Sequence, residues 1–367
     1  MLKPLFLRMF RYTPVPVTGV KGPFLIFANH NADLDPVLVN LAFDEQMYFV
    51  ASEHIFRKGF LSKLLVRYFD PISRLKGGTE ASAAMEMLRR LRRGHNICVF
   101  AEGDRSFNGL TFPIPPATGK LAKAAGVPVV TFKLEGGYFT TPRWGKKMRR
   151  GKMLGYTVNV YEPPALKNMS ADEVNRILAE DLFEDAYARQ EQERVRFKGK
   201  DRAEWLETAL YICPRCGGIG TLHSHKNEFF CDCGLRAQFT EYGYLEGDTP
   251  YTTIAEWDAW QTHRLKEIAA EQSAAPVFTD ENVRLVRVLP GHAEEPADAG
   301  RLTMCRDRLT CGETTLLISD ISAMAVYGRA NVTFTHTDGH FELLAAPPFC
   351  GRKYFELFRM IKEGFIL

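Results

Sequence analysis

The chain has 367 residues, of which 46% are hydrophobic and 25% are charged, and its formal net charge is +3. These proportions are those of ordinary globular proteins, so they exclude disordered and fibrous classes, and the length allows two or three domains. The charge is unevenly divided. Residues 1–170 hold 25 Lys and Arg against 12 Asp and Glu, a net of +13, and the remainder holds 22 against 32, a net of −10. The first part is therefore expected to bind anions.

The sequence shows no pattern of a membrane span or a signal peptide. No stretch approaches the roughly 18 uninterrupted apolar residues of a spanning helix, and residues 1–16 lack the apolar core and cleavage site of a signal peptide. Four of the eight cysteines cluster with the spacing of metal ligands, and the others are scattered without a disulfide framework. We therefore expect a cytoplasmic protein.

Short β-rich runs alternate with helical stretches, such as residues 82–94, through the first part of the chain. Strands separated by helices require crossover connections, so the predicted fold class is α/β, with a mainly parallel sheet covered by helices. In such a sheet, active sites gather at the carboxyl ends of the strands. The five runs are residues 23–29, 47–52, 96–103, 127–136 and 156–163.

A different pattern follows residue 170. A helical region is expected from Ser170 to about Leu210, and its charged middle is typical of a linker or an exposed helix. A helix with two tryptophans is expected at residues 253–271, and β-rich runs with a closing helix follow from Val277. This last region resembles pleckstrin-homology-like domains in outline, although another small β-barrel capped by a helix has the same pattern. The expected domains are residues 1–195, 205–245 and 250–367.

Two polar clusters follow predicted strands, and each has an ordinary structural explanation. The first, FANHNADLDP, holds His30 and Asp35. Asp35 before Pro36 is a good helix N-cap, and a histidine at the end of a buried strand can simply be hydrogen-bonded there. The second cluster, FAEGDRS at residues 100–106, also follows an apolar run. Both clusters should therefore emerge at the same edge of the sheet.

Together, the clusters resemble the two signature motifs of the glycerolipid acyltransferases, the family of 1-acylglycerol-3-phosphate acyltransferases. The motifs are a histidine with an aspartate five residues on, and Glu-Gly-x-Arg-Ser. An apolar stretch ending near Arg74 and the GVPVV strand at residues 126–130 match the family more loosely, and the resemblance covers residues 1–190. The family usually has a serine shortly after the histidine and often a proline where this chain has Ala101. These departures bear on substrate choice more than on chemistry.

The resemblance implies a mechanism that these residue types can perform. His30 would be the general base that takes the proton of a glycerol hydroxyl, and Asp35 would orient its imidazole. An arginine fork and a serine hydroxyl would bind the phosphate of the acceptor. Hydrolysis through Ser106 as a nucleophile is a rival hypothesis, but DRSFNG lacks the Gly-x-Ser-x-Gly elbow. The predicted substrate-binding residues are Arg74, Glu102, Gly103, Arg105 and Ser106.

Two basic runs and the first helix have structural interpretations, and the second run and the helix also have functional ones. RRLRR at residues 89–93 ends a predicted helix, where cations offset the helix dipole. KKMRRGK at residues 146–152 is either a solvated face or a contact with anionic lipid or the phosphates of an acyl carrier. The first helix either lies in a membrane interface or packs on its own domain. Its apolar face comprises Leu2, Leu5, Phe6, Met9 and Phe10.

The clustered cysteines form two pairs with 14 residues between the inner ones. Two such knuckles joined by a β-hairpin are how a zinc ribbon brings four thiolates to a tetrahedral ion, although the second pair is spaced by one residue instead of two. His223 and His225 lie between the pairs, but four cysteines already fill a structural site. We expect structural zinc on Cys213, Cys216, Cys231 and Cys233.

The sequence thus predicts an enzyme that transfers a fatty acyl group from acyl-CoA or acyl carrier protein to a lysophospholipid, preferably 1-acylglycerol 3-phosphate. We expect it to work on the anionic inner face of the membrane as a peripheral protein, and we do not expect nucleic acid as its partner. The alternative is a zinc-ribbon adaptor that binds nucleic acid or protein and carries a degenerate acyltransferase domain. The intact motif residues argue against that alternative.

Overall fold

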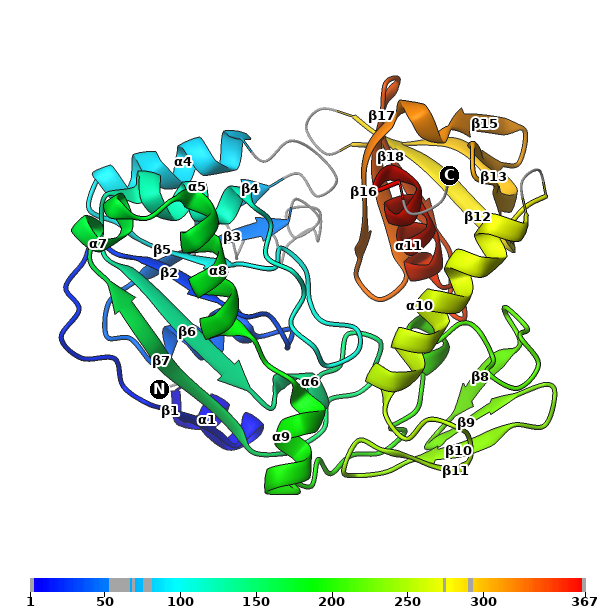
Figure 1. The fold of residues 1–367 in the computed structure, drawn as a ribbon, viewed down its shortest axis with the longest axis horizontal. Coiled ribbons are helices and arrows are strands. Elements are labelled where there is room, and N and C mark those ends of the chain that lie inside the picture. The colour runs from blue at the N-terminus through cyan, green and yellow to red at the C-terminus, as the bar shows by residue number, and fades with distance from the viewer. Residues whose placement is uncertain are drawn as a thin grey trace. The chain divides into compact units, whose positions relative to one another are not determined.

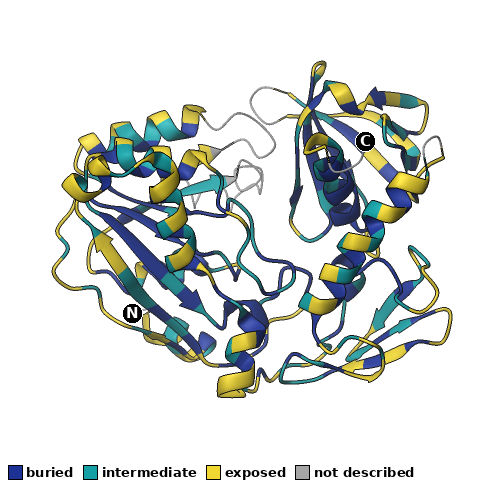
Figure 2. Cartoon of the chain, in the orientation of Figure 1, coloured by how far each residue is buried: buried dark blue, intermediate teal, exposed yellow. Residues whose placement is uncertain are grey.

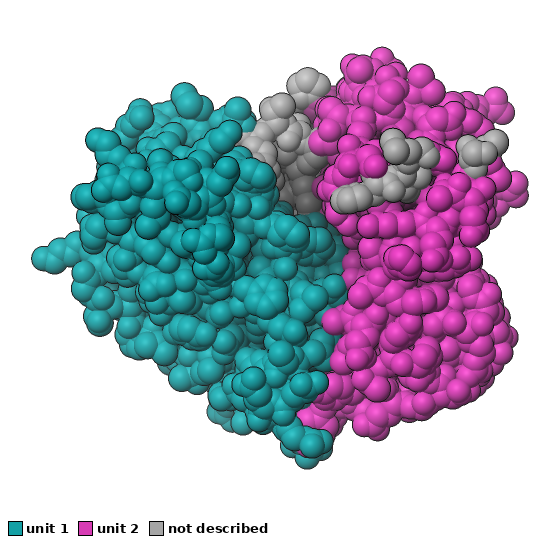
Figure 3. Space-filling model, viewed as in Figure 1, with its two compact units in different colours: residues 1–74, 80–143, 147–199 teal, residues 75–79, 144–146, 200–367 magenta. Residues whose placement is uncertain are grey.

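The computed structural model describes residues 3–52, 67, 70–74, 81–272, 275–289 and 293–364. Leu2, which belongs to the predicted apolar face, lies outside these residues. The chain folds into two compact units, each with its own hydrophobic core (Figure 3). The first unit comprises residues 1–74, 80–143 and 147–199, and the second comprises residues 75–79, 144–146 and 200–367.

A seven-stranded sheet forms the centre of the first unit, in the order β1-β7-β6-β2-β5-β3-β4 (Figure 1). Its neighbouring strands are parallel except for β6 and β7, which are antiparallel. The predicted α/β class with a mainly parallel sheet is therefore confirmed. The strands are β1 (Tyr12–Pro14), β2 (Leu25–Ala28), β3 (Met47–Ser52), β4 (Ile72–Arg74), β5 (Asn96–Phe100), β6 (Val129–Glu135) and β7 (Met153–Tyr161).

Helices cover both faces of this sheet because its central strands are apolar on both faces. The central strands of the sheet are buried (Figure 2). In β2, Leu25 and Phe27 pack with α4, α5 and α8, whereas Ile26 and Ala28 pack with α1 and α2 on the other face. None of the helices in the described part of the chain is long and apolar enough to cross a membrane. The helices described in the first unit are α1 (Lys3–Phe10), α2 (Asp35–Asn40), α4 (Ala81–Arg92), α5 (Ala117–Ala125), α6 (Gly137–Thr140), α7 (Pro163–Asn168), α8 (Ala171–Leu182) and α9 (Ala186–Glu193).

The helical region predicted from Ser170 to about Leu210 is only partly correct. Ser170 begins α8 with a capping box, but α9 ends at Glu193, where Arg194 takes a left-handed conformation with φ of 48°. The charged residues that follow are irregular, and a short 3-10 helix, η2 (Leu206–Thr208), precedes the cysteine module. The charged middle is therefore partly helical and partly irregular.

Two antiparallel sheets and two helices make up the second unit. The smaller sheet has the order β11-β10-β9-β8, and the larger has the order β15-β14-β13-β12-β18-β17-β16 with α11 after its last strand. The predicted β-rich C-terminal region is confirmed, and its closing helix fits the pleckstrin-homology-like outline. The elements are β8 (Leu222–His225), β9 (Glu228–Cys231), β10 (Arg236–Phe239), β11 (Leu245–Asp248), α10 (Ile254–Glu271), β12 (Phe278–Val288), β13 (Glu294–Met304), β14 (Arg308–Cys311), β15 (Thr314–Leu317), η3 (Ile318–Asp320), β16 (Ile321–Tyr327), β17 (Asn331–His336), β18 (Gly339–Leu344) and α11 (Gly351–Lys362).

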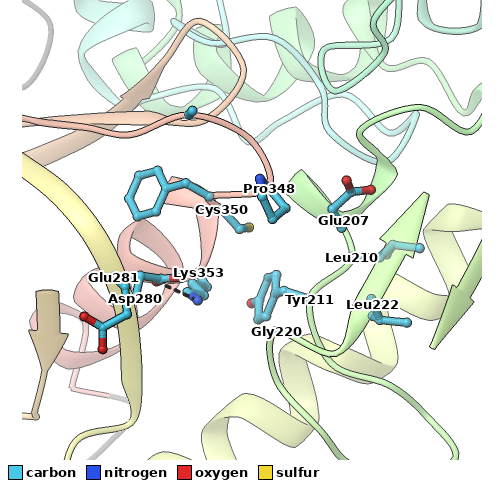
Figure 4. A pocket seen from close by; sticks show the side chains of 12 residues that line it. Glu207, Leu210, Tyr211, Gly220, Leu222, Asp280, Glu281, Pro348, Cys350 and Lys353 are labelled. Carbon is cyan, nitrogen blue, oxygen red and sulfur yellow. Dashed lines mark ion pairs between the residues drawn. The ribbon is translucent and has the colours of Figure 1, made fainter. Parts of the chain in front are cut away.

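A cavity of about 210 Å³ lies within the second unit, between the segment around η2, β12 and the start of α11 (Figure 4). The buried ammonium group of Lys353 borders it and lies 2.7 Å from Asp280 Oδ2. The hydroxyl of Tyr354 donates to the same carboxylate oxygen at 2.5 Å. Burying an unpaired charge is costly, so this pairing is what allows a lysine to lie inside the unit.

Candidate active site and cysteine cluster

The two polar clusters meet at one edge of the large parallel sheet. His30 follows β2 and Glu102 follows β5, and these strands are parallel neighbours with Ala28 opposite Phe100. The backbone N–H of His30 donates to Glu102 Oε1 at 2.7 Å, and the N–H of Ser106 donates to the carbonyl of His30 at 3.3 Å. The prediction that both clusters emerge at the same edge is therefore correct.

The imidazole of His30 is oriented from two sides. Its Nδ1 lies 2.9 Å from Asp35 Oδ2, so the ionised carboxylate places the proton on Nδ1. The ring stacks on Phe100 with 4.2 Å between centroids. Nε2 makes no hydrogen bond to any described residue, and the His30 side chain is 21% exposed. With Nδ1 hydrogen-bonded to Asp35, Nε2 is the ring nitrogen that can accept a proton from a substrate, as a general base requires.

Asp35 does not cap α2 as the N-cap interpretation proposes. The helix begins at Asp35 itself, Leu34 occupies the N-cap position, and no side chain caps the helix. Instead, Asp35 Oδ2 accepts hydrogen bonds from the backbone N–H groups of Asn31 at 2.7 Å and Ala32 at 2.8 Å. The side chain of Asp35 is fully buried. It therefore fixes the loop around His30 as well as the imidazole.

The sequence analysis assigned no role to the residues that anchor the His30 loop to β6 and to the segment after α8. Asn29 forms two hydrogen bonds with the backbone of Leu134 in β6, accepting at 2.7 Å and donating at 2.8 Å. The side-chain amides of Asn29 and Asn31 also donate to Glu184 Oε2, and Gly136 donates to Glu184 Oε1 at 3.2 Å. Burial raises the pKa of Glu184 to about 7. Glu184 follows α8, more than 150 residues away, and no motif marks it.

The carboxylate of Glu102, a predicted substrate-binding residue, is hydrogen-bonded within the protein. Its Oε1 accepts from His30, and its Oε2 accepts from the backbone N–H of Phe112 at 2.6 Å. Burial raises the pKa of Glu102 well above its usual range, while the two backbone donors oppose that change. Since both oxygens are occupied inside the protein, Glu102 joins the two motif loops and is a positioning residue in this structure.

Arg105 is the motif cation that remains near the surface. Its Nη1 lies 2.7 Å from Asp33 Oδ1, and the Asp33 side chain is 53% exposed. The Arg105 side chain itself is only 13% exposed, so an incoming anion would reach the guanidinium by displacing the exposed Asp33 carboxylate. Arg105 also donates its backbone N–H to Asp104 at 2.9 Å. The guanidinium is therefore held beside the loop of His30.

The other predicted binding residues are placed less favourably. Ser106 is fully buried, and its hydroxyl accepts from the N–H of Gly109 at 2.9 Å. In this position the hydroxyl shapes the turn, and the phosphate contact predicted for Ser106 stays a prediction. Gly103 adopts φ of 70°, a conformation that favours glycine. Arg74 ends β4, and its side chain lies outside the described residues.

The four predicted metal ligands come together in the second unit. All four Sγ atoms lie within 4.8 Å of one another, with Cys213 and Cys233 at 3.7 Å and Cys216 and Cys231 at 3.8 Å. A tetrahedral ion with Zn–S bonds of about 2.3 Å places its sulfurs about 3.8 Å apart, so the spacing fits zinc. The cluster does not include His223, whose Nε2 lies 3.0 Å from Asp232.

Comparison with known proteins identifies the unit that carries the His30 site. Residues 11–135 match the family model described as Acyltransferase. This segment is an acyltransferase domain. The match runs from the residue before β1 to the end of β6, so it contains both motif loops, and acyl transfer in general follows from it. The resemblance seen in the sequence is confirmed for these residues.

A solved structure is also similar to this chain. The 1-acyl-sn-glycerophosphate (LPA) acyltransferase PlsC from Thermotoga maritima shows 21% identity and a TM-score of 0.40, and the match covers 49% of this chain and 75% of that one. A likeness of this size does not decide the substrate. Among curated proteins, no sequence matches the chain.

Proposed function

We propose that the acyltransferase domain transfers a fatty acyl group from an acyl thioester to the hydroxyl of a lysophospholipid, with 1-acylglycerol 3-phosphate as the acceptor. The observation that carries the proposal is the geometry of His30 at the carboxyl edge of the sheet, where a buried carboxylate holds Nδ1 and no described residue forms a hydrogen bond with Nε2. An alcohol is a poor nucleophile unless a base removes its proton, and this imidazole is placed to do so.

In the proposed reaction, Nε2 of His30 takes the hydroxyl proton as the acceptor's oxygen forms a bond to the thioester carbonyl carbon. The resulting imidazolium is stabilised by Asp35. When the tetrahedral intermediate collapses, the carbon–sulfur bond breaks and the thiolate leaves. The proton on Nε2 passes to the leaving sulfur, so the products are an ester and a free thiol, and His30 returns to its neutral form.

The choice of a phosphate-bearing acceptor rests on Arg105. Its guanidinium lies beside the His30 loop, and its acidic partner among the described residues is the exposed Asp33. In 1-acylglycerol 3-phosphate, the phosphate and the reacting hydroxyl are on adjacent carbons, so a cation this close to the base suits the acceptor. The thiol carrier, coenzyme A or acyl carrier protein, is not distinguished by this geometry.

We further propose that the cysteine cluster binds a structural zinc ion. Four cysteines complete a tetrahedral site and leave no open position for a substrate. The hydrogen-bonded turns after each pair support it, since Gly217 donates to the carbonyl of Cys213 and Gly234 to that of Cys231, both at 2.9 Å. The ion would fasten the sheet β8–β11.

The test of the catalytic proposal compares two histidine variants. Turnover of radiolabelled palmitoyl-CoA with 1-oleoylglycerol 3-phosphate should fall by about a hundredfold or more in His30→Ala, the loss expected for a general base. His95→Ala is the matched control, because His95 precedes β5 at the opposite edge of the sheet and should leave turnover unchanged. Comparable activity of His30→Ala and the wild type would refute the proposal.

A further inference from the structure

Three basic side chains from distant parts of the sequence surround one hollow of about 370 Å³ in the first unit. They are Arg11, Arg150 and Lys198, and all three are exposed. Among the described residues, none of the three has an acidic partner, whereas neighbouring Lys152 is paired with Glu193 at 2.9 Å. Three unneutralised cations around an open hollow create a local positive potential that attracts anions.

The backbone holds these cations in place. Arg11 follows α1 in a left-handed conformation with φ of 48°, and its carbonyl accepts from Met153 at 3.2 Å. Arg150 and Lys198 exchange two backbone hydrogen bonds, at 2.8 and 2.9 Å. Behind them, Phe197 is buried directly against Gly151, where any Cβ would collide with its ring. The hollow is therefore built by the fold and does not depend on mobile side chains alone.

The hollow lies at the same edge of the sheet as His30. β6 is parallel to β2 and antiparallel to β7, so the end of β6 and the start of β7 are neighbours, with Glu135 opposite Leu154. β1 is parallel to β7, and Tyr12 is opposite Met153. The residues just before β1 and β7 therefore share the edge that carries His30. Three strand spacings of about 4.8 Å place β1 about 14 Å from β2.

Apolar side chains accompany the cations at this edge. The apolar face of α1 packs mostly on the unit's own core, since Phe10 is buried and Phe6 and Met9 are partly buried. This favours the packing interpretation of α1 over a helix lying in the membrane. Leu5 remains 58% exposed on α1, and Met148 is 39% exposed two residues before Arg150. Cations mixed with exposed apolar side chains are typical of a surface that meets a membrane interface.

We propose that Arg11, Arg150 and Lys198 bind the phosphate groups of anionic lipids in a bilayer and so turn the edge carrying His30 toward the membrane. The inference rests on the proposed function, in which the acceptor is itself a membrane lipid. The acceptor's own phosphate cannot occupy the hollow while its hydroxyl reacts, because the two groups are on adjacent carbons and the strands concerned are about 14 Å apart. The hollow therefore holds neighbouring lipids.

The experiment is co-sedimentation of the full-length, zinc-loaded protein with sucrose-loaded vesicles. The protein should bind vesicles of equal phosphatidylcholine and phosphatidylglycerol much more tightly than phosphatidylcholine alone, and added salt should weaken that binding. A basic residue near such a surface is worth roughly a fivefold change in partition, so Lys198→Gln should bind about fivefold more weakly. Lys167→Gln is the matched control, because Lys167 is exposed on α7, beyond the far end of β7.

Three results would overturn the proposal. Equal binding to neutral vesicles would mean that charge does not matter, and equal weakening by Lys167→Gln would mean that only net charge matters. A raised KM for acyl-CoA in Lys198→Gln, measured in detergent with unchanged vesicle binding, would assign the hollow to the donor. Vesicle binding does not require turnover, so the two proposals can fail separately. A protein that shows no acyltransferase activity but still binds vesicles through Lys198 would refute the proposed function and support the lipid-binding surface.

Discussion

Glu102→Gln separates a residue that holds the site together from one that touches substrate. In the wild type, the two carboxylate oxygens accept from the backbone N–H groups of His30 and Phe112 at 2.7 and 2.6 Å. A glutamine keeps the shape, but its amide nitrogen must face one of these donors. The substitution therefore removes one hydrogen bond and weakens the other, without changing the volume of the side chain.

The magnitude follows from these two bonds and from burial. Each hydrogen bond to a charged group contributes about 1.5 to 3 kcal/mol, and losing one leaves a buried N–H without a partner. The neutral glutamine offsets part of this loss, because burial disfavours the charged form of Glu102 and raises its pKa. We expect the free energy of unfolding of the first unit to fall by about 2 kcal/mol. We also expect kcat to fall, because the His30 loop loses its tie to the neighbouring loop.

Urea unfolding and steady-state kinetics on the same preparations provide the test. Glu180→Gln is the control, since Glu180 is 61% exposed and, within the described part of the chain, its ion pair is with Arg176 on the surface of α8, where such pairs contribute little. A Glu102→Gln protein with normal stability and kcat, but with a raised KM for the lysophospholipid, would refute the positioning role. It would restore the substrate contact that the motif alone predicts.

Three further outcomes follow from the site and the cysteine cluster. Glu184 has a pKa of about 7 in the folded chain, above its ordinary value of 4.5, so its contribution to stability is complete below pH 4.5 and falls as pH rises toward 7. The free energy of unfolding, measured with urea, should therefore be lower near pH 8 than near pH 5 in the wild type. In Glu184→Gln, this difference between the two pH values should be smaller by about 2 to 3 kcal/mol. Cys213→Ser should lose the zinc that elemental analysis finds in the wild type, and damage should begin in the sheet β8–β11. Arg105→Lys keeps the charge but loses the planar fork, so kcat/KM should fall by about 1.5 to 3 kcal/mol for an acceptor with a phosphate and much less for a neutral monoacylglycerol. Equal losses on the two acceptors would show that Arg105 only supports the Asp33 loop.

The meeting of the two motif loops could be predicted from the sequence because it depends on local patterns. Apolar runs mark β2 and β5, and parallel strands bring their carboxyl ends to one edge. β1 was not predicted, because Tyr12–Pro14 is three residues long and contains a proline, so its sequence carries no strand pattern. It is a strand because it pairs with β7. The helix-cap interpretation of Asp35 also depended on a local pattern, and it was wrong because the N-cap position is Leu34, one residue earlier. The carboxylate of Asp35 accepts a hydrogen bond from Asn31 in the preceding loop and does not cap the helix.

The roles of individual motif residues were harder to predict, since a motif does not state which way each side chain points. Glu102 and Ser106 are polar residues in a signature, which suggests contact with substrate, yet the structure buries both. Lys198, in contrast, belongs to no motif but lies in a candidate binding surface. It is part of a charged stretch with the composition of a linker or an exposed helix, and its backbone pairing with Arg150 places it beside the cationic hollow.

The acyltransferase match ends at residue 135, but the structure that holds the active site does not. Gly136 and Glu184 lie beyond that limit, and together with Leu134 they fix Asn29 and Asn31 on either side of His30. Without Glu184, the buried amides of both asparagines would lose a charged acceptor, and a buried donor without a partner costs about 1 to 3 kcal/mol. A general base depends on its position to within fractions of an ångström. The candidate site therefore extends to the segment that follows α8, which belongs to the same compact unit as the motif strands.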